Sequence, residues 1–522
     1  MNAAASTTAS SAAPTQRWHA RRKTWLMLLL ALLVGIEFLE NGMVVFAASH
    51  VAGGIDAAPR EFAQVLAAYA IGSMLMIALQ QWLSRHFGYR RYLAGALLLF
   101  LAGALASAAA GGLGAMTLAR FIQGFGGGAL FTSCRVLVPL LFGPADRPRA
   151  LKYFMLVLFG LGACSPVLAA TLVESLDWRW LFLAVVPLVL LALAGVWALL
   201  PDGVGRGGEP VRWAAGPLLL FAAAVTLVQL GLSAARYDVF GNPLHLALFG
   251  LAGTALLVWF VRHQWDHDEP LFRLRDLRHP AYLTGLLLYF LHYCLSNASS
   301  FVFPVLAEQG LGLPLATAAW LNTFAALVTL AVAYAYLKLG ARLPRKKPLM
   351  VAGALAMALS AWLLASLPPG ASAGALLLAL GAKGVFGALL ILPAAGLTFR
   401  ELGDERFAHA YQSKNLMRQL AGSFSSSVAA VLLQGREFAN DAQLASAIDR
   451  AHPQAQGWLD AVQAGFAARG LAPAEAHGAA LAELAQTVNR QALVLACDDL
   501  YRLLAALAVA TAVVVLAQRR FA

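Results

Sequence analysis

The sequence predicts an all-α polytopic membrane protein with fourteen transmembrane helices. Of its 522 residues, 60% are hydrophobic and only 12% are charged, far more apolar material than the core of a soluble domain requires. A bilayer core about 30 Å thick needs roughly 20 apolar residues for each spanning helix, and runs of that length recur along the chain. The alternating segments of about 10 residues that are typical of a transmembrane β-barrel do not occur in the sequence.

The expected helices are apolar runs that are bounded by charged or turn-forming residues. In order they cover residues 25–48, 62–83, 92–110, 115–140, 151–172, 181–199, 214–234, 244–262, 281–305, 315–337, 348–367, 373–397, 407–434 and 499–517. The first run is too long for a signal peptide and has no clear cleavage site, so we expect it to remain as a helix behind a tail of residues 1–24.

The basic residues support this helix count. Of the 38 Lys and Arg residues, 25 belong to the two tails and the six loops on the side of the N-terminus, whereas the six short loops on the other side hold Arg60, Arg179 and Arg236. The positive-inside rule then places both termini in the cytoplasm. The net charge of +12 is therefore explained by topology, and we expect no nucleic-acid partner, because the charges share no single face.

The longest expected segment outside the membrane covers residues 435–498, on the side opposite to the termini. It contains amphipathic stretches that are interrupted by "RGLAPAEAHG" (469–478). Two interpretations remain open at this point. The segment is either a lid packed on the outer mouth of the bundle or a docking surface for an external partner.

Two acidic residues have no topological explanation. Glu37 and Glu40 lie within the expected helix 25–48, about 18 and 22 Å from its cytoplasmic end, and Arg120 lies at a similar depth in the fourth helix. Charges persist at mid-membrane where they face a partner or a water-filled path. Asn41 shares the helix face of Glu37. We predict a proton-exchanging cluster of these two carboxylates with Arg120, and the alternative is a permanent ion pair that only fixes helix packing.

Five further basic residues lie in or beside expected helices: Arg135, Lys383, Lys414, Arg418 and Arg502. Arg135 and Lys414 are near cytoplasmic helix ends, so we expect their side chains to reach that interface, and Arg502 to reach the opposite one. Lys383 lies about 15 Å from the outer end of its helix. Because an ammonium at that depth is costly, we expect it to face the transport path.

Catalysis and cofactor chemistry are not expected. The sequence shows no Ser/His/Asp constellation, no His or Cys cluster with metal-ligand spacing and no phosphate-binding loop between a strand and a helix. We interpret Cys134, Cys164, Cys294 and Cys497 as packing residues. We therefore expect neither a metal nor a cofactor, and the chain also lacks the soluble signalling domain of a sensor.

Three motifs resemble those of a known family. "LARFIQGFGGGALFTS" (118–133) resembles the fourth-helix motif of the major facilitator superfamily, an Arg followed by Gln-Gly and a glycine-rich run. "DWRWLFLAVVP" (177–187) resembles the entry to helix 6 of that superfamily, and "NLMRQLAGSFSSS" (415–427) resembles the start of its penultimate helix. With fourteen helices and a long segment before the last one, the chain is similar to the drug:proton antiporter-2 branch, the EmrB/QacA type.

The resemblance implies two six-helix halves, residues 25–200 and 280–517, that rock about a midplane cavity, with two inserted helices in 213–262. It also implies a role in proton coupling for Arg120, and Glu40 stands where the first helix of the family carries an Asp. The gating residues that the resemblance implies are Gly88, Arg90, Arg91, Gly124 and Pro166.

Two motifs depart from the pattern of the family. In "QWLSRHFGYRR" (81–91), Gln81 replaces the first Gly, and Arg85 stands where the family has an Asp of the gating charge relay. "SPVLAA" (165–170) keeps only the Pro of the antiporter motif Gly-Pro-x-x-Gly-Gly. Small residues still permit close helix packing and the Pro still bends the helix, so antiport remains consistent with the sequence.

The predicted function is proton-coupled efflux of lipophilic or amphipathic small molecules, such as drugs or aromatic or fatty acids, across the bacterial inner membrane by alternating access. The long outer segment suits transfer to a periplasmic adaptor protein and an outer-membrane channel. The alternative is a proton-coupled importer of a small polar solute, which predicts more polar residues at mid-depth. Candidate substrate-binding residues are Asn41, Tyr289, His292, Tyr293, Asn297 and Lys383, with ordinary packing as the alternative for the aromatic ones.

Overall fold

The computed structural model describes residues 12–206, 215–238, 243–267, 270–272, 274–343, 345–368, 370–400, 402–447, 453–519 and 521. Fourteen helices in this part of the chain are long and apolar enough to cross a membrane, which confirms the predicted fold class and helix count. The elements are α1 (Ala12–Phe46), α2 (Ala48–Gly54), α3 (Pro59–Phe87), α4 (Tyr89–Ala109), α5 (Leu113–Leu141), α6 (Arg147–Ser175), α7 (Trp180–Leu183), α8 (Val186–Leu199), α9 (Ala215–Asp238), α10 (Pro243–Asp266), η1 (Leu274–Leu277), α11 (Pro280–Pro304), η2 (Val305–Gly310), α12 (Leu315–Leu339), η3 (Gly340–Arg342), α13 (Lys347–Leu364), α14 (Ala373–Leu389), α15 (Ile391–Thr398), α16 (Asp404–Ala447), α17 (Pro453–Ala468) and α18 (Pro473–Ala517).

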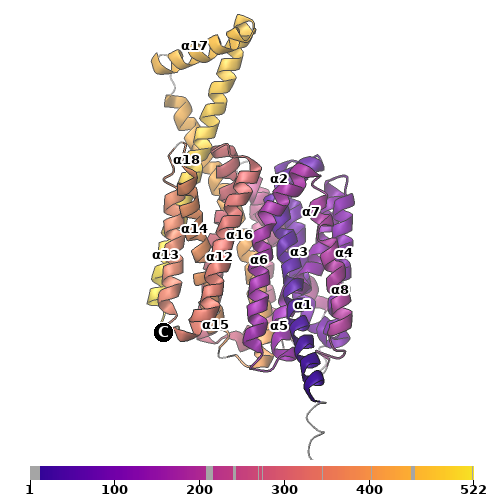
Figure 1. Cartoon of the computed structure of the whole chain (residues 1–522). Helices are drawn as coiled ribbons and strands as arrows, with labels where there is room; N and C mark the ends of the chain where they lie inside the picture. The colour runs from indigo at the N-terminus through magenta and orange to yellow at the C-terminus, as the bar shows by residue number, and fades with distance from the viewer. Residues whose placement is uncertain are drawn as a thin grey trace, which may run out of the picture.

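The helices form two bundles that stand side by side (Figure 1). In the first bundle α1 packs against α6, and α5 packs against both α3 and α4; in the second, α11 packs against α16, and α13 packs against α14 and α18. Each bundle has its own buried apolar core. Helices α9 and α10, which the resemblance implies to be inserted, pack on each other, and α9 contacts α3 of the first bundle and α16 of the second.

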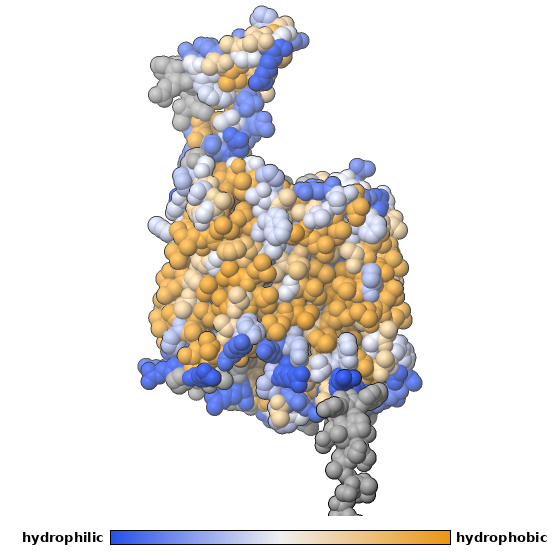
Figure 2. Space-filling view, in the orientation of Figure 1, coloured by the Kyte–Doolittle hydropathy of each residue, from blue (hydrophilic) through white to orange (hydrophobic). Residues whose placement is uncertain are grey.

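On the face seen in Figure 2, a band of apolar side chains crosses the two bundles, and hydrophilic side chains gather at both ends. Large apolar residues such as Leu191, Leu251 and Trp259 are exposed on the protein surface. An exposed apolar band of this extent fits the hydrocarbon of a bilayer and not water.

Helix α1 begins and the chain ends at the same end of the bundles (Figure 1), which is called the basic end below. Arg90 donates to the carbonyl of Trp197 near the end of α8, and Lys347 donates to the carbonyl of Gln518 after α18, so both lie at this end.

Glycines in α5 bring three helices of the first bundle into close contact. A Cβ atom at Gly124 would meet the backbone of Tyr69 in α3, and one at Gly126 would meet the backbone of Phe100 in α4. Small residues at such positions let helix backbones approach one another closely in a membrane. The structure thus places Gly124 in a packing contact, and it holds Arg120, one turn earlier in α5, close to α3.

Two of the expected helices are interrupted. The expected helix 281–305 continues after Pro304 as the π-helical turn η2, a rare geometry that occurs often at functional sites. The expected helix 373–397 is divided at Leu390 into α14 and α15.

The segment 435–498 differs most from expectation. Helices α16 and α18 have 44 and 45 residues, about 66 Å each at 1.5 Å per residue, which is twice the bilayer core. Together with α17 they form an arm that stands above the second bundle (Figure 1). The interpretation as a lid packed on the mouth is therefore wrong. Arg436 of α16 donates two hydrogen bonds to Asp499 Oδ2 of α18, at 2.8 and 2.6 Å, and joins the two long helices.

Candidate functional site

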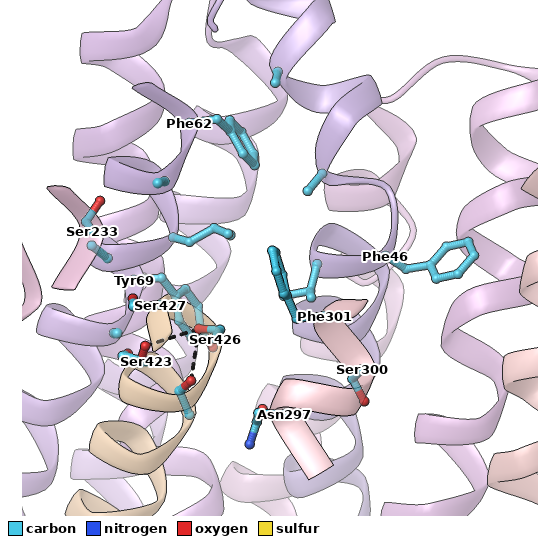
Figure 3. A pocket seen from close by; sticks show the side chains of 18 of the residues that line it. Phe46, Phe62, Tyr69, Ser233, Asn297, Ser300, Phe301, Ser423, Ser426 and Ser427 are labelled. Atoms are coloured by element: carbon cyan, nitrogen blue, oxygen red, sulfur yellow. Dashed lines mark hydrogen bonds between the residues drawn. The ribbon is translucent and has the colours of Figure 1, made fainter. Parts of the chain in front are cut away.

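A cavity of about 610 Å³ lies between the two bundles, in the part remote from the basic end. Its walls come from α1, α2, the start of α3, α9, the end of α11 with η2, and the middle of α16. Figure 3 shows Phe62 and Phe301 on facing walls, with Asn297 and Ser426 deeper in the space. A volume of this size accommodates a drug-sized molecule.

The polar lining of the cavity is mostly uncharged. It comprises Asn41, Ser49, Gln229, Ser233, Asn297, Ser300, Gln309, Gln419, Ser423, Ser426 and Ser427. Among the described residues that line the cavity, Glu308 is acidic and none is basic. Hydroxyl and amide groups beside phenyl rings suit a molecule that has both apolar and hydrogen-bonding parts.

Glu40 of α1 and Arg120 of α5 form a fully buried ion pair beneath the cavity. Arg120 Nη1 donates to Glu40 Oε1 at 2.5 Å and to Gln123 Oε1 at 2.7 Å, and both charged side chains are 0% exposed. The guanidinium lies 4.3 Å from the ring centre of Tyr69, which itself lines the cavity. The ring of Tyr69 is therefore in contact with the ion pair and also forms part of the cavity wall.

Glu37, one turn earlier in α1, has a different partner. Arg418 Nη2 of α16 donates to Glu37 Oε1 at 3.2 Å, so this ion pair joins the first bundle to the second. The expectation of one cluster in which both carboxylates share Arg120 is therefore wrong. The depth of a residue follows from its position along a helix, but its direction around the helix axis depends on how the bundles meet, and here α16 approaches α1 on the side of Glu37.

Each of the two carboxylates keeps one buried oxygen without a hydrogen-bond partner among the described residues, Glu37 Oε2 and Glu40 Oε2. A buried acceptor that lacks a partner costs about 1–3 kcal/mol. A proton bound at either oxygen removes the charge of the carboxylate and weakens its hold on the guanidinium. The arrangement is therefore able to convert proton binding into the loss of an interhelical contact.

Lys414 does not reach the interface as the sequence predicts. Its side chain is buried in α16, and Nζ lies 4.4 Å from the ring centre of Tyr411, 4.9 Å from that of Phe131 and 5.2 Å from that of Tyr289. No ion pair of Lys414 is formed within the described part of the chain. The expectation is wrong because α16 passes between the bundles at this level, so that the aromatic rings hold the ammonium in place through cation–π contacts.

Hydrogen bonds join α16 of the second bundle to the first bundle between the cavity and the basic end. Gln412 Nε2 of α16 donates to the carbonyl oxygen of Ile77 in α3 at 2.5 Å, and Asn415 Nδ2 donates to Thr132 Oγ1 in α5 at 2.8 Å. Sequence reasoning missed Gln412, and it noted Asn415 only as the first residue of the motif 415–427. Their spacing of three residues within an apolar helix, one turn before Arg418, is the signal that marks a polar face of α16.

The residues expected to bind substrate lie in different surroundings. Asn41 and Asn297 line the cavity. Lys383 lies behind its wall, with Nζ 3.4 Å from the hydroxyl of Ser300, a lining residue.

The three aromatic candidates of α11 pack against other rings. Tyr289 stacks on Tyr293 with ring centres 6.0 Å apart, and His292 lies 4.7 Å from the ring centre of Phe386. None of the three lines the described cavity. In this structure the three residues pack against other rings, which agrees with the alternative of ordinary packing and not with the expectation of substrate binding.

Four of the five expected gating residues, Gly88, Arg90, Arg91 and Gly124, lie at contacts between helices or near helix ends. Gly88 joins α3 to α4 with a φ of 78°, a conformation that favours glycine. Arg90 forms an ion pair with Asp202, a residue beyond α8, at 2.9 Å. The loop between α3 and α4, in which Arg85 replaces the Asp of the family, thus has an acidic partner from another part of the chain. Arg91 is exposed, and Pro166 lies inside α6.

Two helical bundles around a cavity, with ion pairs buried beneath it, define a polytopic membrane transporter. The family model of the Major Facilitator Superfamily matches residues 30–426, and the chain belongs to this superfamily. The prediction of a fourteen-helix drug:proton antiporter type agrees with the relatives that the sequence matches.

One such relative is the "Putative multidrug resistance protein MdtD" of Salmonella heidelberg (strain SL476), 27% identical over 288 residues that cover 55% of this chain and 60% of that protein. Another is the "Uncharacterized transporter YebQ" of Escherichia coli (strain K12), 27% identical over 289 residues that cover 54% of this chain and 62% of that protein. The chain thus matches about three fifths of the length of these curated relatives.

Solved structures show the same fold at low sequence identity. An auto-inhibited POT family peptide transporter has a TM-score of 0.59 at 15% identity, with 96% of this chain and 97% of that one covered. The human organic anion transporter MFSD10 has a TM-score of 0.56 at 14% identity, with 94% and 99% covered. The proton:xylose symporter XylE has a TM-score of 0.53 at 16% identity, with 78% and 88% covered.

Proposed function

We propose that this transporter exports lipophilic or amphipathic small molecules in exchange for protons. The observation that carries the proposal is the Glu40–Arg120 ion pair, which is fully buried and contacts the ring of Tyr69 in the wall of a cavity that can deliver both water and cargo. Charges buried in a membrane protein commonly mark proton or substrate paths. A carboxylate with an unpartnered oxygen, near the wall of such a cavity, is suited to receive a proton.

The distribution of basic residues supports a cytoplasmic position for the basic end, by the positive-inside rule. The cavity then faces the outside of the cell, and the contacts of Gln412 and Asn415 close the cytoplasmic side. The structure corresponds in this orientation to the outward-open state of an alternating-access cycle.

Protons arriving through the cavity in this state would act on both carboxylates. Protonation of Glu40 weakens its contact with Arg120 within the first bundle. Protonation of Glu37 weakens its contact with Arg418, which joins the bundles, and so favours their rearrangement. Opening toward the cytoplasm would then release the protons and admit the next cargo molecule.

The lining of phenyl rings, hydroxyls and amides supports a lipophilic or amphipathic cargo, and the relative named MdtD carries a multidrug resistance description. For the arm of α16, α17 and α18 we propose contact with a periplasmic adaptor protein, which leads to an outer-membrane channel. Its length beyond the bilayer and the exposed Phe438 support this role.

Transport in proteoliposomes tests the direction of coupling. For a proton antiporter, a lumen more acidic than the bath drives accumulation of a lipophilic cargo inside the vesicle, whereas a proton symporter accumulates its solute when the bath is more acidic. We expect accumulation with the acidic lumen alone. Accumulation driven by an acidic bath would reject export and favour the importer of a polar solute.

The matched variants for this assay are Glu40→Gln and Asp177→Asn. Asp177 also forms a carboxylate–guanidinium pair, with Arg179 at 2.8 Å, but that pair is exposed. We expect gradient-driven accumulation to fall at least tenfold in Glu40→Gln and to stay within twofold of the wild type in Asp177→Asn.

A further inference from the structure

A second cavity, of about 310 Å³, lies at the basic end between the two bundles. Its walls come from α5 and α6 of the first bundle and from α15, α16 and the turn between them in the second. Three arginines line it, Arg135, Arg147 and Arg400, and its other lining residues are apolar or glycine. No acidic residue is among the described ones that line this cavity, which we call the arginine pocket.

Arg135 is the most informative of the three arginines. Its guanidinium lies 4.8 Å from the ring centre of Phe407 and 6.0 Å from that of Tyr411, and it forms no ion pair within the described residues. Arg147 is oriented by hydrogen bonds to the backbone carbonyls of Phe142 and Pro139. Glu401, the sequence neighbour of Arg400, is outside the described residues, so the inference rests on Arg135.

The arginine pocket continues inward as an alternation of cations and rings. Tyr411, which faces Arg135, also faces Lys414 at 4.4 Å. Phe131 lies 4.9 Å from Lys414 Nζ and 4.5 Å from the guanidinium of Arg418. A path of cations and aromatic faces therefore leads from the basic end to the buried acid Glu37, which is paired with Arg418.

We propose that the arginine pocket is the loading site for an anionic cargo, a small carboxylic acid with an aromatic body. Guanidinium groups bind carboxylates through charge-assisted, often bidentate hydrogen bonds, and the adjacent rings offer stacking faces to an aromatic molecule. Cations in apolar surroundings are costly, and an arriving carboxylate offsets that cost at Arg135 and then at Lys414. The volume is at the lower limit of small-molecule sites, about 300 Å³, and suits an acid of one or two rings rather than a whole phospholipid.

This inference names the substrate class of the proposed exporter and rests on the proposed function only for the direction of transport. Binding itself needs no proton gradient. It is therefore measured on the purified full chain in nanodiscs of phosphatidylcholine, by titration with 1-naphthoate and with its uncharged analogue 1-naphthamide. We expect the carboxylate to bind at least tenfold more tightly than the amide, and equal binding would overturn the proposal.

Variants locate the site. Arg135→Gln should weaken naphthoate binding at least tenfold, about 1.4 kcal/mol, whereas Arg179→Gln, which changes an exposed arginine at the opposite end, should leave it within twofold. Arg135→Lys keeps the charge and should restore part of the affinity, which separates loss of charge from loss of folding. Naphthoate binding that is unchanged in Arg135→Gln would overturn the proposal.

Two further titrations distinguish a carboxylate site from a phosphate site. Inorganic phosphate, or nanodiscs that contain phosphatidylglycerol, should not displace naphthoate, and displacement by either would assign the pocket to a phosphate group instead. If Glu40→Gln loses gradient-driven transport while Arg135→Gln still binds naphthoate like the wild type, the proposal of proton coupling stands. The proposal of a loading site at Arg135 is then rejected.

Discussion

Breaking an ion pair of this transporter should lower the free energy of unfolding, and the loss should be larger the more deeply the pair is buried. In the Glu40–Arg120 pair both side chains are 0% exposed, whereas in the Glu37–Arg418 pair the guanidinium is 15% exposed and the carboxylate 3%. Removing one partner of a buried pair costs about 3–5 kcal/mol, because the other charge stays buried without compensation. Glu40→Gln keeps the side-chain shape and an acceptor for Arg120, so its effect isolates the charge.

For Glu37→Gln we expect a smaller loss, about 1–3 kcal/mol, because Arg418 retains access to water and its contacts with two aromatic rings. The exposed pair of Asp177 with Arg179 supplies the control. Asp177→Asn should cost at most about 1 kcal/mol. The expected order of the three variants thus follows from the burial of the three pairs.

The measurement is denaturant unfolding of the purified protein in detergent micelles, with the free energy of unfolding taken from the midpoint and slope of each transition. A loss for Glu40→Gln that equals the loss for Asp177→Asn would contradict this order. It would mean that water or a neighbouring group compensates Arg120 in the folded protein, so that the pair stores no energy for proton binding to release.

Two further predictions concern the contacts between helices. Asn415→Ala should shift the equilibrium away from the outward-open state by a factor of about 2 to 12, which is the contribution of one hydrogen bond. The measurement is the rate of maleimide labelling in a Ser426→Cys background, because Ser426 lines the cavity, and Asn415→Ala should slow this labelling. The matched control Asn322→Ala, which removes a bond within α12, should label at the wild-type rate, and equal rates in both variants would contradict the closing role of α16. Gly124→Val should lower the free energy of unfolding by about 1–3 kcal/mol through overpacking, whereas Gly160→Val, with open space at its Cβ, should cost less, under about 1 kcal/mol. Equal losses would show that close packing of α5 does not depend on this glycine.

Helix number and depth were predictable from the sequence because both follow from distance along a helix. Runs of apolar residues and the distribution of arginines indicated fourteen spans, and a rise of about 1.5 Å per residue placed Glu40 level with Arg120. Those two residues do meet in the structure. Proton coupling by the pair stays a prediction.

The partner of Glu37 and the burial of Lys414 were not predictable in the same way. Both depend on how α16 crosses the bundle interface, and the composition of a single helix does not define its neighbours. The arm was missed for another reason. Residues 435–498 form amphipathic stretches of limited hydropathy. The apolar run that marks a membrane span ends at the border of this segment, although the helices α16 and α18 continue into it.

The most direct test of proton coupling at Glu40 is the movement of protons that accompanies cargo. A pH-sensitive dye inside proteoliposomes reports proton flux when cargo is added in the absence of a pH gradient, and exchange of labelled for unlabelled cargo reports transport that needs no net proton movement. For Glu40→Gln we expect cargo exchange within about threefold of the wild type and a cargo-dependent proton signal that is clearly smaller than that of the wild type, since Glu37 remains as a proton acceptor. A cargo-dependent proton signal of wild-type size in Glu40→Gln would contradict proton coupling at this residue.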